Sequence, residues 1–550
     1  MQQIIECVPN FSEGRDMAVI GQITREIESI DGVRLLDVDP GKATNRTVVT
    51  FVGPPDAVIE AAFLAIQKAG ELIDMRKQKG AHSRMGATDV CPLIPVANIT
   101  MEETCQYARA LARRVGEELQ IPVYLYEAAQ TDKSRSNLSV IRAGEYEGFF
   151  EKIKNPVWKP DFGPAIFDAK RGATVIGARD FLVAYNVNLN TTSTRRANAI
   201  AFDIREAGRN IIENGVKVNQ PGSLKSVKAI GWYIEEYGIA QISINLTNLQ
   251  VTPLHIAFDE ACKKAAARGI RVTGSELVGL IPLKSMLDAG KYFLRKQKRS
   301  LGVSEAELVR IAIKSMGLDE LSPFDPNEKI IEYRLRNDAE SKLVKMPLNA
   351  FADETASESP APGGGSIAAY IGALGASLAT MVANLSSHKR GWDDRWETFS
   401  DWAERGQYYK DVLLQLVDLD TAAFNRIMGA MGMAKSTEAE QSARNKAIQE
   451  ATRYAIEIPF KVMETAAESM DLIKAMAVGG NPNSVSDAGV GALCARSAVL
   501  GAFMNVRINA AGYADKEFVT EMISRGKKIE NKTIALEQEI LNIVNEKIGC

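Results

Sequence analysis

The sequence predicts a multidomain protein in which two α/β subdomains, each a mixed sheet with helices in a ferredoxin-like order, precede an all-α helical bundle. Two observations support this. Short apolar runs alternate with helical patterns through the first part of the chain, whereas beyond it helix formers dominate and strand patterns stop. At 550 residues the chain is long enough for about three to four domains. We expect the α/β subdomains at 1–180 and 181–335, a polar linker at 336–343 and the bundle at 344–550.

The first subdomain is predicted to contain three helices among five strands. Two of the helices have clear start signals: Pro54 occupies a first helical position, and Thr100 with Glu103 forms a capping box. The strands are expected at 3–8, 33–39, 46–52, 89–95 and 123–126, and the helices at 17–30, 54–73 and 100–120.

The second subdomain repeats this order of elements without a repeat at the level of residues. Strands are expected at 182–188, 227–233, 240–245 and 270–274, and helices at 193–214 and 253–268. Ser304 is the expected N-cap of a further helix that ends near Met316. The repeated order indicates two similar sheets, each covered by helices.

The last part of the chain is predicted to form long helices at 366–387, 397–433, 437–476, 485–511 and 515–547. The stretch from Ile367 to Ser387 carries no charge and is about long enough to cross a bilayer. However, it is rich in small residues, which favour close packing between helices. We therefore expect a buried bundle helix there rather than a membrane span.

Composition narrows the class of protein. The formal net charge of −3 gives no global attraction to nucleic acid, and 46% hydrophobic with 25% charged residues is typical of a soluble globular protein. The six cysteines are widely spaced and no histidine pair has ligand spacing, so a disulfide scaffold and a metal site are not expected. The N-terminus lacks a signal-peptide pattern, and we expect a cytoplasmic protein.

One of only three histidines, His82, lies in the glycine-bounded stretch 80–86, GAHSRMG. Histidine can take and return a proton near neutral pH, and glycines allow the backbone to approach a ligand closely. His82 is therefore a candidate acid/base, although a loop histidine on a basic surface would give the same local pattern. Asp39, which ends a predicted strand before Pro40-Gly41, is a second candidate; on local pattern a turn aspartate is favoured.

Two further stretches could bind anions. Between 205 and 231 there are five basic and two acidic residues, which is typical of a solvated face but would also suit a carboxylate chain. Residues 360–366, PAPGGGS, place three glycines before a helix, where backbone N–H groups can face an anion. A flexible hinge explains these glycines equally well.

Asp420 lies within an apolar helical stripe formed by Leu413, Val417, Phe424, Ile427 and Met431, whereas Asp418 projects elsewhere. A carboxylate on an apolar face is costly unless it is paired, and desolvation raises its pKa, as a general acid/base at neutral pH requires. Asp420 could instead form a structural ion pair with Arg496 or Arg507. The residues alone leave both interpretations open.

Several long motifs resemble those of known families. The motifs IECVPNFSEGR (5–15), TNRTV (44–48), FVGPP (51–55), IDM (73–75), RMG (84–86), DVCP (89–92), IRAGEYE (141–147), GWY (231–233) and IIEY (330–333) resemble glutamate formimidoyltransferases. The motifs APGGGS (361–366), VD (417–418) with Asp420, and FMNV (503–506) resemble the formimidoyltetrahydrofolate cyclodeaminase domain. The whole chain is covered, in the order of the bifunctional formimidoyltransferase-cyclodeaminase family.

The resemblance implies that His82 is the acid/base of the transferase and Asp420 that of the cyclodeaminase, with Asp39 and Arg84 as possible catalytic or substrate-orienting residues. Arg84 could hold a substrate carboxylate bidentately. Ala81 stands where an acidic residue is expected, and 210–218 looks like an insertion relative to the animal enzymes. Folate contacts are implied at Gly163, Pro164, Ala165, Ile166, Phe167, Asp168, Ala169, Lys170, Arg171, Gly172, Gly222, Ser223, Leu224, Lys225, Ser226, Val227, Lys228, Ala229, Ile230 and Gly231.

The implied function is transfer of a formimidoyl group from N-formimidoyl-L-glutamate to tetrahydrofolate, followed by cyclisation and deamination to 5,10-methenyltetrahydrofolate and ammonia, in histidine degradation and one-carbon metabolism. Tetrahydrofolate, in polyglutamylated form, is the expected co-substrate, and no metal is expected. The resemblance also implies a ring-like homo-octamer made of dimers. The alternatives are a transferase whose bundle serves assembly, and a membrane-associated or polyanion-binding scaffold.

Overall fold

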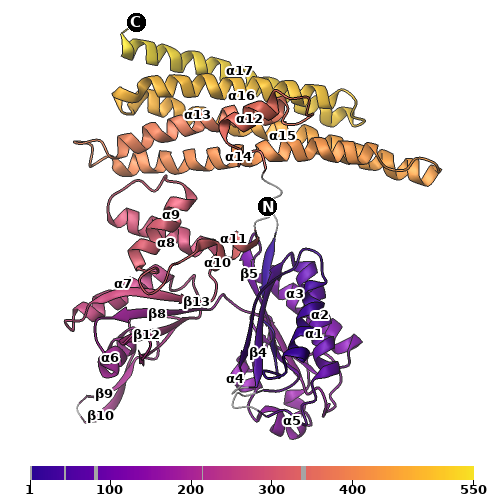
Figure 1. Ribbon diagram of the computed structural model, residues 1–550, viewed down its shortest axis with the longest axis vertical. Coiled ribbons are helices and arrows are strands. Elements are labelled where there is room, and N and C mark those ends of the chain that lie inside the picture. Colours follow the sequence, from indigo (N-terminus) through magenta and orange to yellow (C-terminus); the bar gives the residue numbers. More distant parts are fainter. Residues whose placement is uncertain (1–2, 42–44, 80–83, 214, 336–341, 550) are drawn as a thin grey trace. The chain divides into compact units, whose positions relative to one another are not determined.

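The computed structural model describes residues 3–41, 45–79, 84–213, 215–335 and 342–549. The chain divides into two compact units, which are described separately (Figure 1). Unit 1 comprises residues 1–282, 318–323 and 329–331, and unit 2 comprises 283–317, 324–328 and 332–550. The predicted domain boundaries at 180, 335 and 343 stay sequence-based predictions.

The first sheet of unit 1 has seven strands in the order β1-β4-β2-β5-β7-β6, with β3 paired to β4. β5, β7 and β6 pair parallel and the other strands antiparallel, so the predicted mixed sheet is confirmed. The strands are β1 (Ile4–Cys7), β2 (Asn10–Phe11), β3 (Arg34–Gly41), β4 (Arg46–Gly53), β5 (Thr88–Ala97), β6 (Val123–Glu127) and β7 (Thr174–Ala178).

Helices pack on both faces of this sheet. α1 (Met17–Glu28), α2 (Pro55–Leu72) and α3 (Met101–Glu118) bury one apolar core with the strands. The short helices α4 (Leu138–Ile141) and α5 (Glu145–Lys152) cover a smaller cluster on the other face. The capping box predicted at Thr100 and Glu103 is present, and it satisfies backbone donors at the start of α3.

The sequence patterns missed one central strand and ended another too early. β7, a run of five buried residues between β5 and β6, was not predicted, because a short apolar run carries no periodicity of its own. Asp39 was expected at a turn, but it lies inside β3, which continues through Pro40 and Gly41. Proline is tolerated there because β3 pairs only with β4 and is an edge strand.

The second sheet has the order β11-β12-β8-β13 and is antiparallel throughout, so only the first sheet is mixed. Its chain order, strand-helix-strand-strand-helix-strand, is ferredoxin-like, as predicted. The elements are β8 (Val183–Leu189), α6 (Thr194–Ile204), β11 (Val227–Ile234), β12 (Ile239–Leu246), α7 (Leu254–Ala266) and β13 (Val272–Val278).

The helix predicted at 193–214 is wrong in its second half. α6 ends at Ile204, and the chain then forms a hairpin of β9 (Arg209–Glu213) and β10 (Val216–Gln220). Gly208 has a φ of +58°, and a Cβ at this position would lie 1.8 Å from the Gln220 carbonyl oxygen. This close backbone approach ends the helix, although apolar residues at helical spacing continue beyond it.

Unit 2 is helical apart from its connections. It contains α8 (Leu283–Lys296), α9 (Glu305–Met316), α12 (Leu348–Thr355), α13 (Gly364–Ser387), α14 (Trp396–Met431), α15 (Glu438–Gly479), α16 (Val485–Ala510) and α17 (Lys516–Ile548). The short helices α10 (Pro326–Lys329) and α11 (Ile331–Leu335) lie where the chain passes between the units. The five long bundle helices are confirmed to within three residues at each end.

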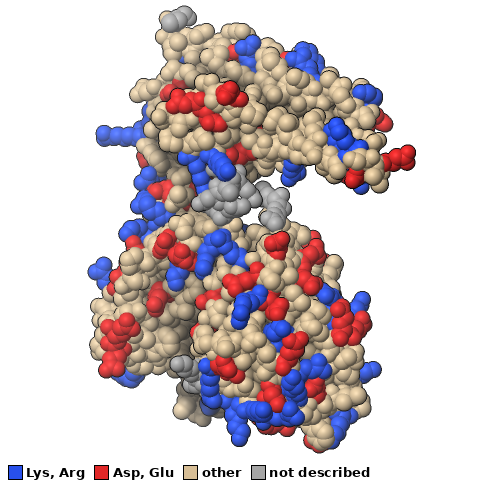
Figure 2. Space-filling view, turned by 45° about the vertical axis from the view of Figure 1, so that its right-hand side comes forward, with Lys and Arg blue, Asp and Glu red and all other residues tan. Residues whose placement is uncertain are grey.

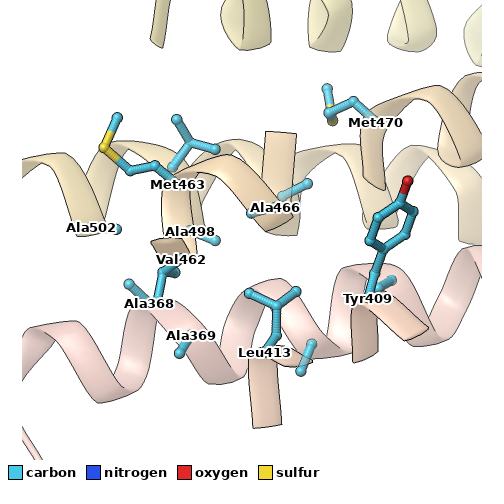
Figure 3. Close-up of a cluster of buried hydrophobic side chains, with 14 of the residues drawn as sticks. Ala368, Ala369, Tyr409, Leu413, Val462, Met463, Ala466, Met470, Ala498 and Ala502 are labelled. Atoms are coloured by element: carbon cyan, nitrogen blue, oxygen red, sulfur yellow. The ribbon is translucent and has the colours of Figure 1, made fainter. Parts of the chain in front are cut away.

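Small side chains let the bundle helices pack closely. The core shown in Figure 3 joins residues of α13, α14, α15 and α16, among them Ala368, Ala369, Tyr409, Leu413, Val462, Met463, Ala466, Met470, Ala498 and Ala502. Two helical segments, Gly364–Ser387 and Pro482–Ala510, are long and apolar enough to cross a membrane, with 61% and 50% of their most apolar stretches buried. This burial agrees with the expected bundle helix at 367–387.

Candidate active sites

His82 and its neighbour Ala81 lie outside the described residues, whereas the residues on both sides of 80–83 are described. Arg84 donates a 2.8 Å hydrogen bond to the Gln78 carbonyl oxygen, which joins the residues on either side of 80–83. Asn45 donates to the neighbouring Lys79 carbonyl oxygen at 3.2 Å. These bonds join the described residues on either side of 80–83 to one another and to Asn45.

Asp89 organises the residues that follow this loop. Its side chain is fully buried, and it accepts a 3.0 Å hydrogen bond from the backbone N–H of Met85. It also forms ion pairs with Arg46, at 2.9 Å, and with Arg142. A buried carboxylate is retained only when it is paired in this way, so the cluster fixes the chain next to the loop.

Arg84 is 7% exposed and its guanidinium is bonded to the protein. Besides Gln78, it pairs with Glu147 at 2.8 Å and lies 3.8 Å from Glu145. These contacts connect the loop to α5. The bidentate contact with a substrate carboxylate that the sequence indicated for Arg84 stays a prediction.

Asp39 is exposed, and it lies on the same face of the sheet as Asn10 and Arg46. It lies opposite Val48 on β4, which in turn lies opposite Asn10 on β2. Directly opposed residues project from the same face of a sheet. Asn10 accepts hydrogen bonds from Arg46 at 2.9 and 2.6 Å, and Arg46 pairs with Asp89. Asp39 is therefore on the face that carries the charged network.

Unit 1 contains a cavity of about 940 Å³ between its two sheets, and only part of the predicted folate stretches lines it. Ser226 and Lys228 of the second stretch lie in its wall, together with Arg142 and Arg179. The first stretch lies elsewhere: Gly172 bridges to Gly86, beside the His82 loop. The wall also includes Tyr126, Glu127, Asn137, Ser139, Asp180, Thr247 and Asn248.

Glu6 is a titratable residue that sequence reasoning passed over. It is 4% exposed on β1, and burial raises its pKa to about 7, an effect that the nearby Arg179 partly offsets. Arg179 in turn lines the cavity. The sequence did contain a signal for Glu6: it is a carboxyl group among apolar strand residues. Burying such a group is costly, so its presence there indicates a role.

In unit 2, Asp420 of α14 lies against the first turn of α13. Ser366 donates a hydrogen bond from Oγ to Asp420 Oδ2 at 3.1 Å, and its backbone N–H also bonds the carboxylate. A Cβ on Gly365 would lie 2.2 Å from Asp420 Oδ1, so only glycine allows this contact. Burial raises the pKa of Asp420, and the hydrogen bonds from Ser366 partly oppose that shift.

The alternative of a structural ion pair is not borne out. No arginine pairs with Asp420 among the residues that the structure describes. Arg496 lies 3.6 Å from Glu537, and the guanidinium of Arg507 lies 5.0 Å from the ring centre of Phe503. Asp420 is therefore a half-buried carboxylate held by hydrogen bonds rather than by a salt bridge, and its role as an acid/base stays a prediction.

Asp418 has a structural role instead. Its carboxylate accepts hydrogen bonds from the backbone N–H groups of Leu343 and Val344, at 2.9 and 3.4 Å. It thus holds the chain where it enters the bundle. No cluster of three or more His, Cys, Asp or Glu side chains that could hold a metal ion occurs within the described ranges.

Comparison with known proteins identifies the family to which each part of the chain is similar. Models of the formiminotransferase domain match residues 4–179, for its N-terminal subdomain, and 184–336, and a formiminotransferase-cyclodeaminase model matches 347–528. The formimidoyltransferase-cyclodeaminase of Gallus gallus is 45% identical over 95% of both chains.

Two shorter proteins match parts of the chain. A glutamate formimidoyltransferase of Thermoplasma acidophilum is 43% identical over 53% of this chain and 92% of its own. A methenyltetrahydrofolate cyclohydrolase of Methylorubrum extorquens is 34% identical over 37% of this chain and 97% of its own. The three domain matches and the full-length similarity lead to one conclusion: the chain belongs to the bifunctional formimidoyltransferase-cyclodeaminase family.

Proposed function

We propose that the two activities of this enzyme are carried out by separate sites, one in each unit. The first moves a formimidoyl group from N-formimidoyl-L-glutamate to tetrahydrofolate and releases glutamate. The second converts 5-formimidoyltetrahydrofolate into 5,10-methenyltetrahydrofolate and ammonia. The observation that carries this proposal is the half-buried Asp420 carboxylate with its raised pKa, located in a unit that does not contain His82.

For the transfer step, His82 is the proposed acid/base. The N5 nitrogen of tetrahydrofolate attacks the amidine carbon of formimidoylglutamate and gives a tetrahedral intermediate. His82 takes the proton from N5 and returns it to the glutamate nitrogen, which leaves as the amidine bond breaks. The hydrogen bond between Arg84 and Gln78 and the paired Asp89 cluster support this role, because they fix the residues that flank 80–83 and an acid/base needs a fixed position relative to its substrate. Asp39, on the sheet face that carries this charged network, would orient the substrate.

The cavity in unit 1 is the proposed site for folate. Its volume of about 940 Å³ lies within the usual range of small-molecule sites. Three basic residues, Arg142, Arg179 and Lys228, and three acidic residues, Glu127, Glu145 and Asp180, lie in its wall. Arg142 is paired with Asp89, so Arg179 and Lys228 are the proposed contacts for the carboxylates of a glutamate tail. We therefore propose that polyglutamylated tetrahydrofolate is the preferred form, with the predicted stretch 222–231 contributing Ser226 and Lys228.

For ring closure, Asp420 is the proposed acid/base. The N10 nitrogen of the folate attacks the protonated amidine carbon, and the new C–N10 bond forms the ring. Asp420 takes the proton from N10 and gives it to the amino group, which leaves as ammonia while the methenyl product keeps the positive charge. Because the attack is intramolecular, one group that moves a proton is sufficient for this step.

A homo-oligomer in the cytoplasm is the proposed form of the enzyme, with a ring-like octamer as its expected size. Exposed apolar side chains on the bundle support association: they include Leu374 and Leu385 on α13, Met428 on α14, and Val490, Leu493 and Ile508 on α16. Figure 2 shows broad uncharged areas on the side of the bundle that faces the viewer. Contacts between subunits would cover these side chains.

The test is to follow methenyl-folate absorbance and ammonia release from formimidoylglutamate and tetrahydrofolate with the purified full chain. We expect both products in equal amounts. Formation of 5-formimidoyltetrahydrofolate without ammonia would instead support a transferase whose bundle serves assembly only. Supplying 5-formimidoyltetrahydrofolate directly separates the two steps.

A further inference from the structure

A second polar side chain, Asn505 of α16, reaches the same helical turn as Asp420. A Cβ on Gly364 would lie 3.4 Å from Asn505 Nδ2 and 3.9 Å from its Oδ1. A Cβ on the next residue, Gly365, would collide with Asp420. The two side chains, from α16 and α14, thus contact consecutive residues in the first turn of α13.

The fold itself makes little use of the Asn505 side chain. Within the described residues, its one hydrogen bond runs from Nδ2 to the carbonyl oxygen of Gly501, four residues earlier in the same helix, at 3.0 Å. A helix needs no such bond, since that carbonyl already lies within the regular backbone ladder, and alanine is the better helix former.

Asn509, one turn later, shows the contrast. Its Nδ2 donates a 2.7 Å hydrogen bond to the Ala455 carbonyl oxygen on α15, so it connects two helices. Asn509 thus uses its amide to join two helices. The amide of Asn505 lies instead against the first turn of α13, so its role is sought at that turn. Asn505 is half-buried, so part of this residue remains open to solvent.

We infer that Asn505 is a substrate-positioning residue for ring closure; the inference rests on the proposed function of Asp420. The protonated formimidoyl group ends in a nitrogen with two N–H bonds. Asn505 Oδ1 accepts one of them and the Asp420 carboxylate the other. The leaving nitrogen is then directed at the group that delivers its proton, and the amidine carbon faces N10.

A carboxamide is suited to this task because it accepts a hydrogen bond but does not titrate. Beside Asp420 it adds no charge, so the pKa of the neighbouring carboxyl is left to burial and to Ser366. An aspartate at this position would add a like charge and raise that pKa further. Asn505 therefore controls orientation, whereas Asp420 moves the proton.

The test compares Asn505→Ala, Asn505→Asp, Asn509→Ala and Asp420→Asn in the full-length enzyme, with 5-formimidoyltetrahydrofolate as substrate. Removing one hydrogen bond to a charged group should lower kcat/KM for ring closure in Asn505→Ala by about tenfold. Its thermal midpoint and its rate of formimidoyl transfer should equal those of the parent.

Asn505→Asp should move the acidic limb of the pH–rate profile for ring closure to higher pH. Asn509→Ala should lower the thermal midpoint while kcat/KM per folded protein stays at the parental value.

Parental kinetics in Asn505→Ala would overturn the inference, as would a loss of activity that only follows a loss of folded protein, as in a structural variant. An unshifted pH profile in Asn505→Asp would also count against it. If Asp420→Asn released ammonia at the parental rate, the proposed function itself would fail. If Asp420→Asn is inactive and Asn505→Ala is not, only the present inference fails.

Discussion

Asp420 and Gly365 are in direct contact: a Cβ on Gly365 would lie 2.2 Å from Asp420 Oδ1 and 2.5 Å from its Cγ. The carboxylate therefore lies on the backbone of the first turn of α13, where Ser366 bonds it. This contact explains the glycine at position 365, where any side chain would collide with Asp420. It also makes the position of the Asp420 carboxylate, the proposed acid/base, depend on the absence of a side chain at residue 365 of α13.

The contact predicts that Gly365→Ala impairs ring closure. The added methyl group must displace either Asp420 or the turn, and we expect the rate of ammonia release to fall by about a hundredfold, as for loss of a general acid/base. Gly363→Ala is the matched control, because a Cβ there meets nothing within 4 Å. Ammonia release from formimidoyltetrahydrofolate measures both. Equal rates in the two variants would contradict the role of the contact.

Asp420→Asn should lower cyclodeamination by at least about a hundredfold, since an amide cannot cycle a proton. Formimidoyl transfer should continue, so 5-formimidoyltetrahydrofolate should accumulate when both substrates are supplied. Chromatography of the folate products measures this. A variant that still releases ammonia at the parental rate would send the search for the acid/base to another residue.

The raised pKa of Asp420 also predicts two pH effects. The ring-closure rate should fall with decreasing pH earlier than an ordinary aspartate would allow, because protonation removes the base. Between the unfolded and the folded pKa the native state binds more protons, so the contribution of Asp420 to stability decreases as pH rises through this window. At neutral pH, Asp420→Asn should therefore unfold at the same or a higher denaturant concentration than the parent. A clearly lower midpoint would indicate a structural partner.

Asp418→Ala should lower the stability of the bundle and spare ring closure, which is the opposite of the result expected for Asp420→Asn. The Asp418 carboxylate accepts backbone hydrogen bonds from Leu343 and Val344, and hydrogen bonds to a charged group contribute about 1.5–3 kcal/mol each. We expect a loss of bundle stability of that order and a nearly unchanged ring-closure rate per folded molecule. Denaturant titration and ammonia release distinguish it from Asp420→Asn. Unchanged stability would argue against a structural role for the hydrogen bonds that Asp418 accepts from Leu343 and Val344.

His82→Ala should abolish transfer and leave ring closure of added 5-formimidoyltetrahydrofolate intact, because the proposed second site, at Asp420, lies in another unit. Lys77→Ala is the control: it removes an exposed basic residue from the same segment, and transfer should persist. Comparable loss of both activities in a folded His82 variant would contradict two separate sites.

Lys228→Glu should weaken polyglutamylated folate more than the monoglutamate form, because Lys228 lines the cavity and attracts carboxylates. Lys225→Glu should have less effect, since the side chain of Lys225 is 68% exposed and lies 3.7 Å from Glu206. Binding of both folates at low and high salt measures the difference. Equal weakening of the two folates by Lys228→Glu would show that the cavity wall does not contact the tail.

Local patterns determined much of this protein. The helices of the bundle and the capping box of α3 follow from periodicity and from caps, which depend on residues within a few positions of one another. Asp420 was recognised because it interrupts an apolar stripe. The stripe itself is buried only at Leu413 and Val417, whereas Phe424 and Met431 are exposed, so Asp420 lies at its border.

The tertiary structure decided which residues meet. Helical phase could not choose between an ion pair and an acid/base at Asp420. In the structure Arg496 lies near Glu537 of α17, and Arg507 lies over the ring of Phe503 on its own helix. Likewise, no spacing in the sequence joins Asp89 to Arg46 and Arg142, which are separated by 43 and 53 residues. Such pairs depend on how strands and helices are brought together. Periodicity reports only which face of each element is apolar, so it predicted the elements but not the contacts between them.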